Sequence, residues 1–276
     1  MRDKGFCYTT GDMSAHSFWE DLEARLQEAR EQNLYRKLRC AASPGDLLVF
    51  ADNDYLGLSQ HPKVIEAEQG AAKQGAGAGA SRLISGTSPL HLALEEKLAQ
   101  FKRKEAALFY GSGYAANLGI ISALCGEKDL IVMDKLNHAS LIDAARLSGA
   151  TLRVYPHKNT TRLNEILENN RDIRKKLIVT DSVFSMDGDR APLEELVEIK
   201  NRHQALLMID EAHATGVFGA KGRGLAEQAG VENEIDISMG TLSKAAGVFG
   251  GYVAGSKLLI DALINFSRAF IFATAP

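Results

Sequence analysis

Residues 205–216 read ALLMIDEAHATG, a short apolar run that ends abruptly in charged and polar residues. The run shows no alternation of apolar and polar side chains, which is typical of a strand buried on both faces of a sheet. Asp210 is its last residue, and His213 follows in the next turn. The stretch therefore predicts a buried strand that carries titratable groups at its carboxyl end.

Four more short apolar runs share this design, and stretches with helical periodicity separate them. They are AALFY at 106–110, LIVM at 130–133, KLIVTD at 176–181 and IDISM at 235–239. Short strands that alternate with helices predict an α/β fold with a mostly parallel sheet, flanked by helices on both faces. Ligands of such sheets bind beyond the carboxyl ends of the strands. The residues that follow the five runs are GSGY, DKLNHAS, DSVFSMDGD, DEAHATG and GTLSK, and we expect a site there.

Two helices are predicted before the sheet. Ser17 and Glu20 have capping-box spacing, and the apolar residues that follow predict an amphipathic helix to about Arg36. Ser88 before Pro89 predicts a second helix start. The face of this second helix that we expect to be apolar consists of Leu90, Leu94, Leu98 and Phe101.

Length and composition restrict the class of protein. The chain has 276 residues, 45% of them hydrophobic, so it can bury a large core. A net charge of −3 gives no electrostatic reason to expect nucleic acid. The sequence contains no apolar stretch of membrane-spanning length and no secretory signal pattern. Its three cysteines are far apart and predict neither a disulfide framework nor a metal site, so we expect a soluble cytoplasmic protein.

Two short motifs indicate other protein classes. DEAH at 210–213 is also the Walker B box of helicases, but no GKS or GKT of a nucleotide loop occurs in the chain. GSGYAA at 111–116 matches the GxGxxA of dinucleotide-binding folds, and Asp134 stands near the expected position of the acidic residue. A Rossmann-type NAD(P)-dependent oxidoreductase is therefore an alternative, although it leaves Lys244 without a task.

Lys244 stands among small residues in MGTLSKAAGVFGGY at 239–252. Desolvation lowers the pKa of a lysine, as a nucleophilic amine requires. Pyridoxal 5'-phosphate needs such a lysine for its aldehyde, a carboxylate for its ring nitrogen, donors for its phosphate and a flat group against its ring. Lys244, Asp210, the Gly113 loop with Thr241, and His138 supply these four groups. We therefore predict a pyridoxal phosphate site.

Three of the candidate residues also have purely structural interpretations. A histidine just after a strand, such as His138, often caps the next helix. Asp210 could be a buried carboxylate that caps the following turn, and Ser185 could belong to a turn beside Gly188. These interpretations do not explain why the groups all follow strands at one edge of the predicted sheet.

Seven segments, taken in order, resemble those of the α-oxoamine synthase family, which belongs to the class II aminotransferase-like, fold-type I pyridoxal phosphate enzymes. The segments are NDYLGL at 53–58, GAGAGASR at 75–82, SGTSPLHLALE at 85–95, DxxNHAS at 134–140, VFSMDGDxAPL at 183–193, DEAHATGVFG at 210–219 and GTLSKAAG at 240–247. The resemblance covers the chain from about residue 17 to its end. It implies the fold-type I large domain and a C-acyltransferase activity.

Enzymes of this family condense an amino acid with an acyl thioester and release carbon dioxide. Within the family, the segment DEAHATGVFG most resembles members that give 8-amino-7-oxononanoate in biotin biosynthesis. This resemblance implies L-alanine and pimeloyl-CoA or a pimeloyl-carrier protein as substrates. The glycine C-acetyltransferase, 5-aminolevulinate synthase and serine palmitoyltransferase types are alternatives. A further alternative is a remnant that binds no cofactor and acts only as a binding partner.

The resemblance implies roles for residues that contact the cofactor's ring and aldehyde. Lys244 would bind the aldehyde and move the α-proton of the substrate. Asp210 would pair with the ring nitrogen, His213 with the ring hydroxyl, and Ser185 would be another close contact. His138 would stack on the ring and lie beside the substrate.

The remaining implied roles concern the phosphate and the substrates. The backbone N–H groups of Gly113 and Tyr114 and the hydroxyl of Thr241 would hold the phosphate. Asn53 would lie near the carboxylate of the amino acid. Arg36 is the candidate contact for the acyl substrate.

The resemblance also implies how the chain is organised. Residues 1–45 would form an N-terminal helical segment and residues 46–276 the large domain that binds pyridoxal phosphate. Relatives continue into a smaller C-terminal domain, which this sequence lacks. Family members are homodimers, so a homodimer is expected.

Overall fold

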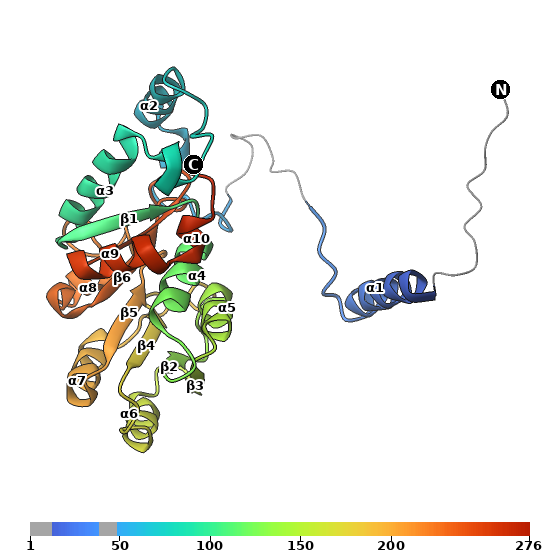
Figure 1. Ribbon diagram of the computed structural model, residues 1–276, viewed down its shortest axis with the longest axis vertical. Coiled ribbons are helices and arrows are strands. Elements are labelled where there is room, and N and C mark those ends of the chain that lie inside the picture. The colour runs from blue at the N-terminus through green and yellow to red at the C-terminus, as the bar shows by residue number, and fades with distance from the viewer. Residues whose placement is uncertain (1–12, 39–48) are drawn as a thin grey trace. The chain divides into compact units, whose positions relative to one another are not determined.

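The computed structural model describes residues 13–38 and 49–276. The chain divides into two compact units, Met1–Phe50 and Ala51–Pro276 (Figure 1). This division lies close to the boundary expected between residues 45 and 46, which stays a prediction. Among the helices of the described ranges, none has the length and apolar character of a membrane span.

Within residues 13–38, the smaller unit forms a long helix, α1 (Met13–Glu31). The predicted helix exists, but both of its predicted ends are wrong. Ser17 lies inside the helix, because no glycine or proline interrupts the residues before it. The helix ends early because Asn33 adopts a left-handed conformation with φ 57°, and the Leu34 N–H then donates to the Ala29 carbonyl at 2.7 Å.

The larger unit is built on a seven-stranded sheet with the order β1-β7-β6-β5-β4-β2-β3. The strands are β1 (Ala106–Tyr110), β2 (Leu130–Asp134), β3 (Thr151–Tyr155), β4 (Lys176–Asp181), β5 (Leu206–Asp210), β6 (Ile237–Thr241) and β7 (Gly251–Gly255). Only β7 runs against its neighbours. The predicted mostly parallel sheet is confirmed, and all five predicted strands point in one direction.

Two strands were not predicted. The strand β3 reads TLRVY and lies at the edge of the sheet, where Arg153 and Val154 are exposed, so it lacks the apolar run of a buried strand. The strand β7 reads GYVAG, and two of its five residues are glycines. Gly251 is required there, because a Cβ at this position would lie 2.6 Å from the Gly113 nitrogen.

Helices cover both faces of the sheet (Figure 1). One face packs against α4 (Gly113–Leu124), α5 (Ala139–Ser148), α9 (Lys257–Phe266) and α10 (Arg268–Ile271). The other face packs against α3 (Pro89–Lys102), α6 (Thr160–Asn169), α7 (Leu193–His203) and α8 (Leu225–Gln228). A further helix, α2 (Pro62–Ala72), has no buried residue.

Successive side chains of β5 lie on opposite faces of the sheet and pack into two different core clusters. Leu207 and Ile209 belong to the cluster with α6, α7 and α8, whereas Met208 belongs to the cluster with α4 and α5. All three side chains are 0% exposed, and burial of each such side chain contributes about 1.5–3 kcal/mol. This two-sided burial explains why the strand reads as a continuous apolar run.

Helix α3 begins as its sequence predicts, but its predicted apolar face is only partly right. Ser88 is the N-cap and forms a capping box with His91, and Pro89 is the first helical residue. Of the predicted face, Leu98 is buried, whereas Leu90 is 50% exposed. The buried face is rotated toward His91 and Lys102, because both side chains have hydrogen-bond partners inside the protein. His91 contacts the Pro276 carbonyl, and Lys102 donates to Glu211.

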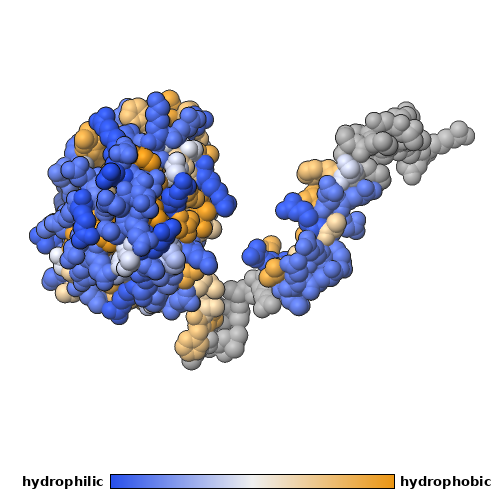
Figure 2. Space-filling view, turned by 90° about the horizontal axis from the view of Figure 1, so that it is seen from below, coloured by the Kyte–Doolittle hydropathy of each residue, from blue (hydrophilic) through white to orange (hydrophobic). Residues whose placement is uncertain are grey.

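Polar residues dominate the face of the larger unit that is visible in Figure 2, and hydrophobic patches interrupt them. Several apolar side chains of this unit are at least 70% exposed: Ile84, Met186, Phe249, Leu258 and Phe272. Exposed apolar side chains in such numbers indicate surface that another molecule could cover.

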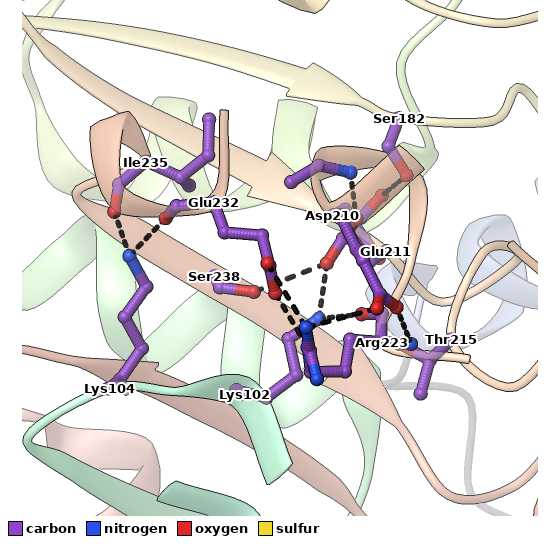
Figure 3. A network of polar contacts seen from close by, with 12 residues as sticks. Lys102, Lys104, Ser182, Asp210, Glu211, Thr215, Arg223, Glu232, Ile235 and Ser238 are labelled. Atoms are coloured by element: carbon purple, nitrogen blue, oxygen red, sulfur yellow. Dashed lines mark hydrogen bonds and ion pairs between the residues drawn. The ribbon is translucent and has the colours of Figure 1, made fainter. Parts of the chain in front are cut away.

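A buried ion pair ties α3 to the turn after β5 (Figure 3). Lys102 is 4% exposed and Glu211 is 0% exposed. The Lys102 amine donates to the Glu211 carboxylate and to the Arg223 carbonyl. Glu211 also accepts from the Ala226 N–H at 3.0 Å. The charges are therefore paired and bonded in the interior, and removal of one would leave the other uncompensated.

We predict that Lys102→Met lowers the free energy of unfolding by about 3–5 kcal/mol, because it leaves Glu211 charged and buried without its partner. The double variant Lys102→Met/Glu211→Leu should be more stable than the single variant. Urea denaturation of both variants and the parent measures this. Equal stability of parent and single variant would contradict the prediction.

Candidate active site

A cavity of about 210 Å³ lies at the carboxyl ends of the central strands. It brings together most of the residues that the sequence predicted for a site: Gly113, Tyr114, His138, Asp210, His213, Thr241 and Lys244. Each comes from a segment that directly follows or ends a strand. The shared direction of these strands therefore assembles the cavity.

Three predicted residues lie outside this cavity. Ser185 lines a neighbouring cavity of about 190 Å³, which shares His213 with the first one. Asn53 is connected through Tyr55, whose hydroxyl donates to the Asn53 Oδ1 at 3.1 Å. Arg36 belongs to the smaller unit, so its proposed contact with a substrate stays a prediction.

The N-terminus of helix α4 forms one end of the cavity. Ser112 is the N-cap, and its hydroxyl accepts from the Ala115 N–H at 3.1 Å. Gly113 and Tyr114 are the first two helical residues, whose N–H groups have no acceptor inside the helix. A Cβ at Gly113 would lie 3.0 Å from the Met239 Cε, so glycine keeps this end open. Such a terminus suits an anion, as the sequence predicted.

The turn after β6 holds Lys244. The Thr241 hydroxyl donates to the Gly250 carbonyl at 2.8 Å, and the Ser243 N–H donates to the Thr241 Oγ1 at 3.1 Å. Gly247 has φ 70°, and a Cβ there would lie 2.2 Å from the Ser59 nitrogen. The loop therefore closes on itself and packs against the segment that follows NDYLGL.

The Lys244 amine lies 2.7 Å from the His213 Nε2, and the Tyr55 hydroxyl lies 2.6 Å from the His213 Nδ1. Burial lowers the pKa of Lys244, although the carboxylates of Asp210 and Asp181 oppose this shift. Burial, followed by the charge of Lys244, lowers the pKa of His213 to about 4. At neutral pH the imidazole is therefore uncharged, and its Nε2 can accept a hydrogen bond from the amine.

Asp210 is 3% exposed, and donors hold both oxygens of its carboxylate. The Ala212 N–H donates to Oδ1 at 2.9 Å, and the Asn117 Nδ2 donates to Oδ2 at 2.8 Å. The structural interpretation of Asp210 as a cap of the next turn is therefore correct, but the residue lines the cavity as well.

Asp181 lies beside Asp210 in the pairing of β4 with β5 and also lines the cavity. Burial and the Asp210 carboxylate raise the pKa of Asp181 well above its usual range. The Asp181 Oδ2 accepts from the His138 N–H at 2.7 Å. Asp181 was not among the predicted site residues, although its place at the end of KLIVTD is the same signal that identified Asp210.

His138 is both a helix cap and a residue of the cavity. It is the N-cap of α5, and its Nδ1 accepts from the Ser140 N–H at 3.3 Å. The side chain is nevertheless exposed, and it lines the cavity. A ring that is held at one nitrogen and open on its surface can stack against a flat ligand.

Asp134 does not support the dinucleotide alternative. Its carboxylate accepts from the backbone N–H groups of Leu136 and Lys158, each at 2.8 Å, and lies 2.9 Å from the His157 Nδ1. A carboxylate with these partners has little capacity left for a ribose. The GSGYAA turn does join a strand to a helix, as predicted, but the acidic residue expected to bind the ribose is bonded to other groups of the protein.

A family model described as aminotransferase class I and II matches residues 45–276. The chain belongs to the class I and II aminotransferase family. Several curated members of the family resemble the chain along most of its length. The 8-amino-7-oxononanoate synthase of Geobacter sulfurreducens is 51% identical over 264 residues, which are 92% of this chain and 68% of that protein. A putative 8-amino-7-oxononanoate synthase of Geobacillus kaustophilus is 49% identical over 265 residues, with the same coverage of 92% and 68%.

Solved structures in this family have the same fold. A serine palmitoyltransferase variant from S. paucimobilis, solved with a bound PLP–myriocin aldimine, matches with a TM-score of 0.84 and 31% identity. The match covers 94% of this chain and 68% of that one. The 8-amino-7-oxononanoate synthase of Francisella tularensis matches with a TM-score of 0.71 and 32% identity, over 82% of this chain and 64% of that one. These matches confirm the predicted fold-type I architecture.

We predict that His213 titrates near pH 4 in the cofactor-free protein and that Lys244→Met raises its pKa, because removal of the cation removes one cause of the depression. Proton NMR of the imidazole measures both values. The same depression means that His213 contributes stability that is lost as the pH falls from about 6.5 toward 4.

The matched control is Lys135→Met, because Lys135 is an exposed lysine that follows β2. This variant should leave the titration of His213 unchanged. A His213 pKa near the ordinary value of 6.5 in the parent protein would contradict the geometry described above.

Proposed function

We propose that the chain binds pyridoxal 5'-phosphate on Lys244 and condenses L-alanine with a pimeloyl thioester, to give 8-amino-7-oxononanoate, carbon dioxide and a free thiol. The observation that carries this proposal is the Lys244 amine in a cavity with the buried Asp210 carboxylate and the N-terminus of α4. The names of relatives that are about half identical support the choice of substrates.

The residues of the cavity fit this cofactor. The Gly113 and Tyr114 N–H groups would hold the phosphate, and Gly113 leaves the space that a Cβ would fill. The Thr241 hydroxyl would join them once its hydrogen turns from the Gly250 carbonyl to the phosphate. Asp210 would hold the ring nitrogen in its protonated form. When bound, pyridoxal phosphate supplies a sink for the negative charge that develops on the α-carbon of the substrate.

Lys244 would move the α-proton of the substrate, and His213 lies beside it. A lysine with a lowered pKa is uncharged often enough to act as a base. The neutral His213 Nε2, 2.7 Å away, can accept a hydrogen bond from the amine and orient it. Tyr55 fixes the imidazole from its other nitrogen. His213 would also contact the ring hydroxyl of the cofactor, and Ser185 would approach from the adjoining cavity.

His138 would cover the face of the ring and lie beside the substrate. Asn53 and Arg36 are proposed contacts for the amino-acid carboxylate and the acyl group.

We also infer a cytoplasmic homodimer whose subunits bury exposed apolar side chains such as Ile84 and Phe249. Sedimentation at several protein concentrations tests the dimer, and a monomer at every concentration would contradict it.

Pyridoxal phosphate added to the purified chain should give a visible absorption band, and borohydride reduction should fix the cofactor to the peptide that contains Lys244. Lys244→Ala should abolish both signals, whereas Lys135→Ala, which changes an exposed lysine, should preserve them. Peptide mapping by mass spectrometry measures the site of attachment. Reduction onto several surface lysines without preference would contradict the proposed site.

With pimeloyl-CoA present, L-alanine should release carbon dioxide at least about tenfold faster than glycine or L-serine, because one missing methyl group or one added hydroxyl changes recognition by that order. Measurement of released carbon dioxide with each amino acid checks this. A preference for L-serine with a long-chain acyl thioester would instead support the serine palmitoyltransferase alternative, which the solved structures exemplify.

A further inference from the structure

Asn117 is a buried polar residue of the cavity to which the proposed function assigns no task. It lies on α4 and is 1% exposed. Its Nδ2 donates to the Asp210 Oδ2 at 2.8 Å and to the Ser140 Oγ at 2.9 Å. Both amide hydrogens are therefore in use. The opposite orientation of the amide would place its oxygen against a carboxylate oxygen, so these two bonds define the orientation.

Ser140 extends this contact to His138. The Ser140 Oγ lies 2.7 Å from the His138 Nδ1. Because Asn117 donates to this oxygen, the hydroxyl hydrogen is available for the histidine nitrogen. The Ser140 N–H also donates to that nitrogen at 3.3 Å. The His138 Nδ1 is therefore an acceptor, and a neutral ring carries its proton on Nε2, which is the nitrogen left free for a ligand.

The oxygen of the Asn117 side chain forms no hydrogen bond, unlike its nitrogen. Its Oδ1 is buried and has no hydrogen-bond partner within the described part of the chain. A buried amide oxygen without a partner opposes folding, and a leucine of similar volume would avoid this cost. The oxygen of the amide therefore does not account for an asparagine here, whereas the two bonds that its nitrogen donates do.

The acidic neighbour of Asp210 makes the donated bond important. Asp181 and Asp210 are paired residues of adjacent strands, and both line the cavity. The Asp210 carboxylate is one cause, after burial, of the raised pKa of Asp181. The hydrogen bond from Asn117 fixes the direction in which the Asp210 carboxylate faces the cavity.

We propose that Asn117 and Ser140 are positioning residues that couple Asp210 to His138, so that the partner of the ring nitrogen and the group against the ring face are held in one arrangement. This inference rests on the proposed function. Neither residue is catalytic, since they act through Asp210 and His138. Both bonds of Asn117 come from one side chain, so a single substitution removes the coupling.

The test uses Asn117→Leu, which keeps the volume but removes both donors, and Ser140→Ala, which interrupts only the connection to His138. Ser122→Ala is the matched control, because Ser122 lies on the same helix and its hydroxyl donates within that helix, to the Leu118 carbonyl at 2.5 Å. Three quantities are measured for each variant: the dissociation constant of pyridoxal phosphate, the pH titration of the visible band of the lysine-bound cofactor, and the thermal unfolding temperature.

Asn117→Leu should bind pyridoxal phosphate roughly tenfold or more weakly, as expected for the loss of a hydrogen bond to a charged group. It should also unfold at a lower temperature than the parent, because the buried Asp210 carboxylate loses one of its two donors. The midpoint of the pH titration should move upward, because a ring nitrogen that is less often protonated withdraws less charge from the lysine nitrogen. Ser140→Ala should weaken binding less than Asn117→Leu does, and Ser122→Ala should change neither quantity.

The outcomes separate this inference from the proposed function. If the parent protein forms no chromophore on Lys244, both fail. If the parent forms it and Asn117→Leu binds the cofactor equally well with an unchanged titration, the positioning role is wrong while the proposed function stands. If Asn117→Leu does not fold, Ser140→Ala decides: weaker binding supports the coupling, and unchanged binding overturns it.

Discussion

The candidate site depends on a negative charge kept inside the protein at Asp210. A carboxylate that leaves water is stable only where donors replace the water it loses. The Ala212 N–H and the Asn117 amide supply these donors, one for each oxygen. The turn after β5 and the first turns of α4 must therefore hold these two donors within hydrogen-bond distance of the Asp210 carboxylate. The same charge lies near the Lys244 amine and limits how far burial depresses its pKa.

The next residue along the chain serves the opposite face of the sheet. Because successive side chains of an extended strand alternate, Asp210 lines the cavity while Glu211 lies in the layer of α3 and α8, paired with Lys102. Figure 3 shows the two acidic residues leaving the same turn. Glu211 thus anchors the turn to the layer of α3 and α8, and Asp210 presents a carboxylate to the cavity on the opposite face.

Much of the fold and the centre of the site could be predicted from the sequence. A buried parallel strand reads as an apolar run, and the residues after such runs meet at one edge, which is how Lys244, Asp210 and His138 were identified. The strands β3 and β7 could not be recognised in this way, because one lies at the edge of the sheet and the other is rich in glycine. The early end of α1 depends on the conformation of a single asparagine.

The residues that the sequence did not reveal are those that act through packing. Asn117 is the fifth residue of α4 and directly follows the GSGYAA motif, and only the docking of α4 on the sheet brings it to Asp210. Tyr55 stands in a recognised segment, but its contact with His213 joins residues 158 positions apart. Spacing along the chain carries no information about such contacts, whereas strand-end residues meet by topology alone.

The most direct measurement is a crystal structure of this chain grown with pyridoxal phosphate. The account predicts continuous density from the Lys244 Nζ to the cofactor, the Asp210 carboxylate within hydrogen-bond distance of the ring nitrogen, and the phosphate at the N–H groups of Gly113 and Tyr114. A cofactor bound elsewhere, or bound here with its ring nitrogen turned away from Asp210, would contradict it.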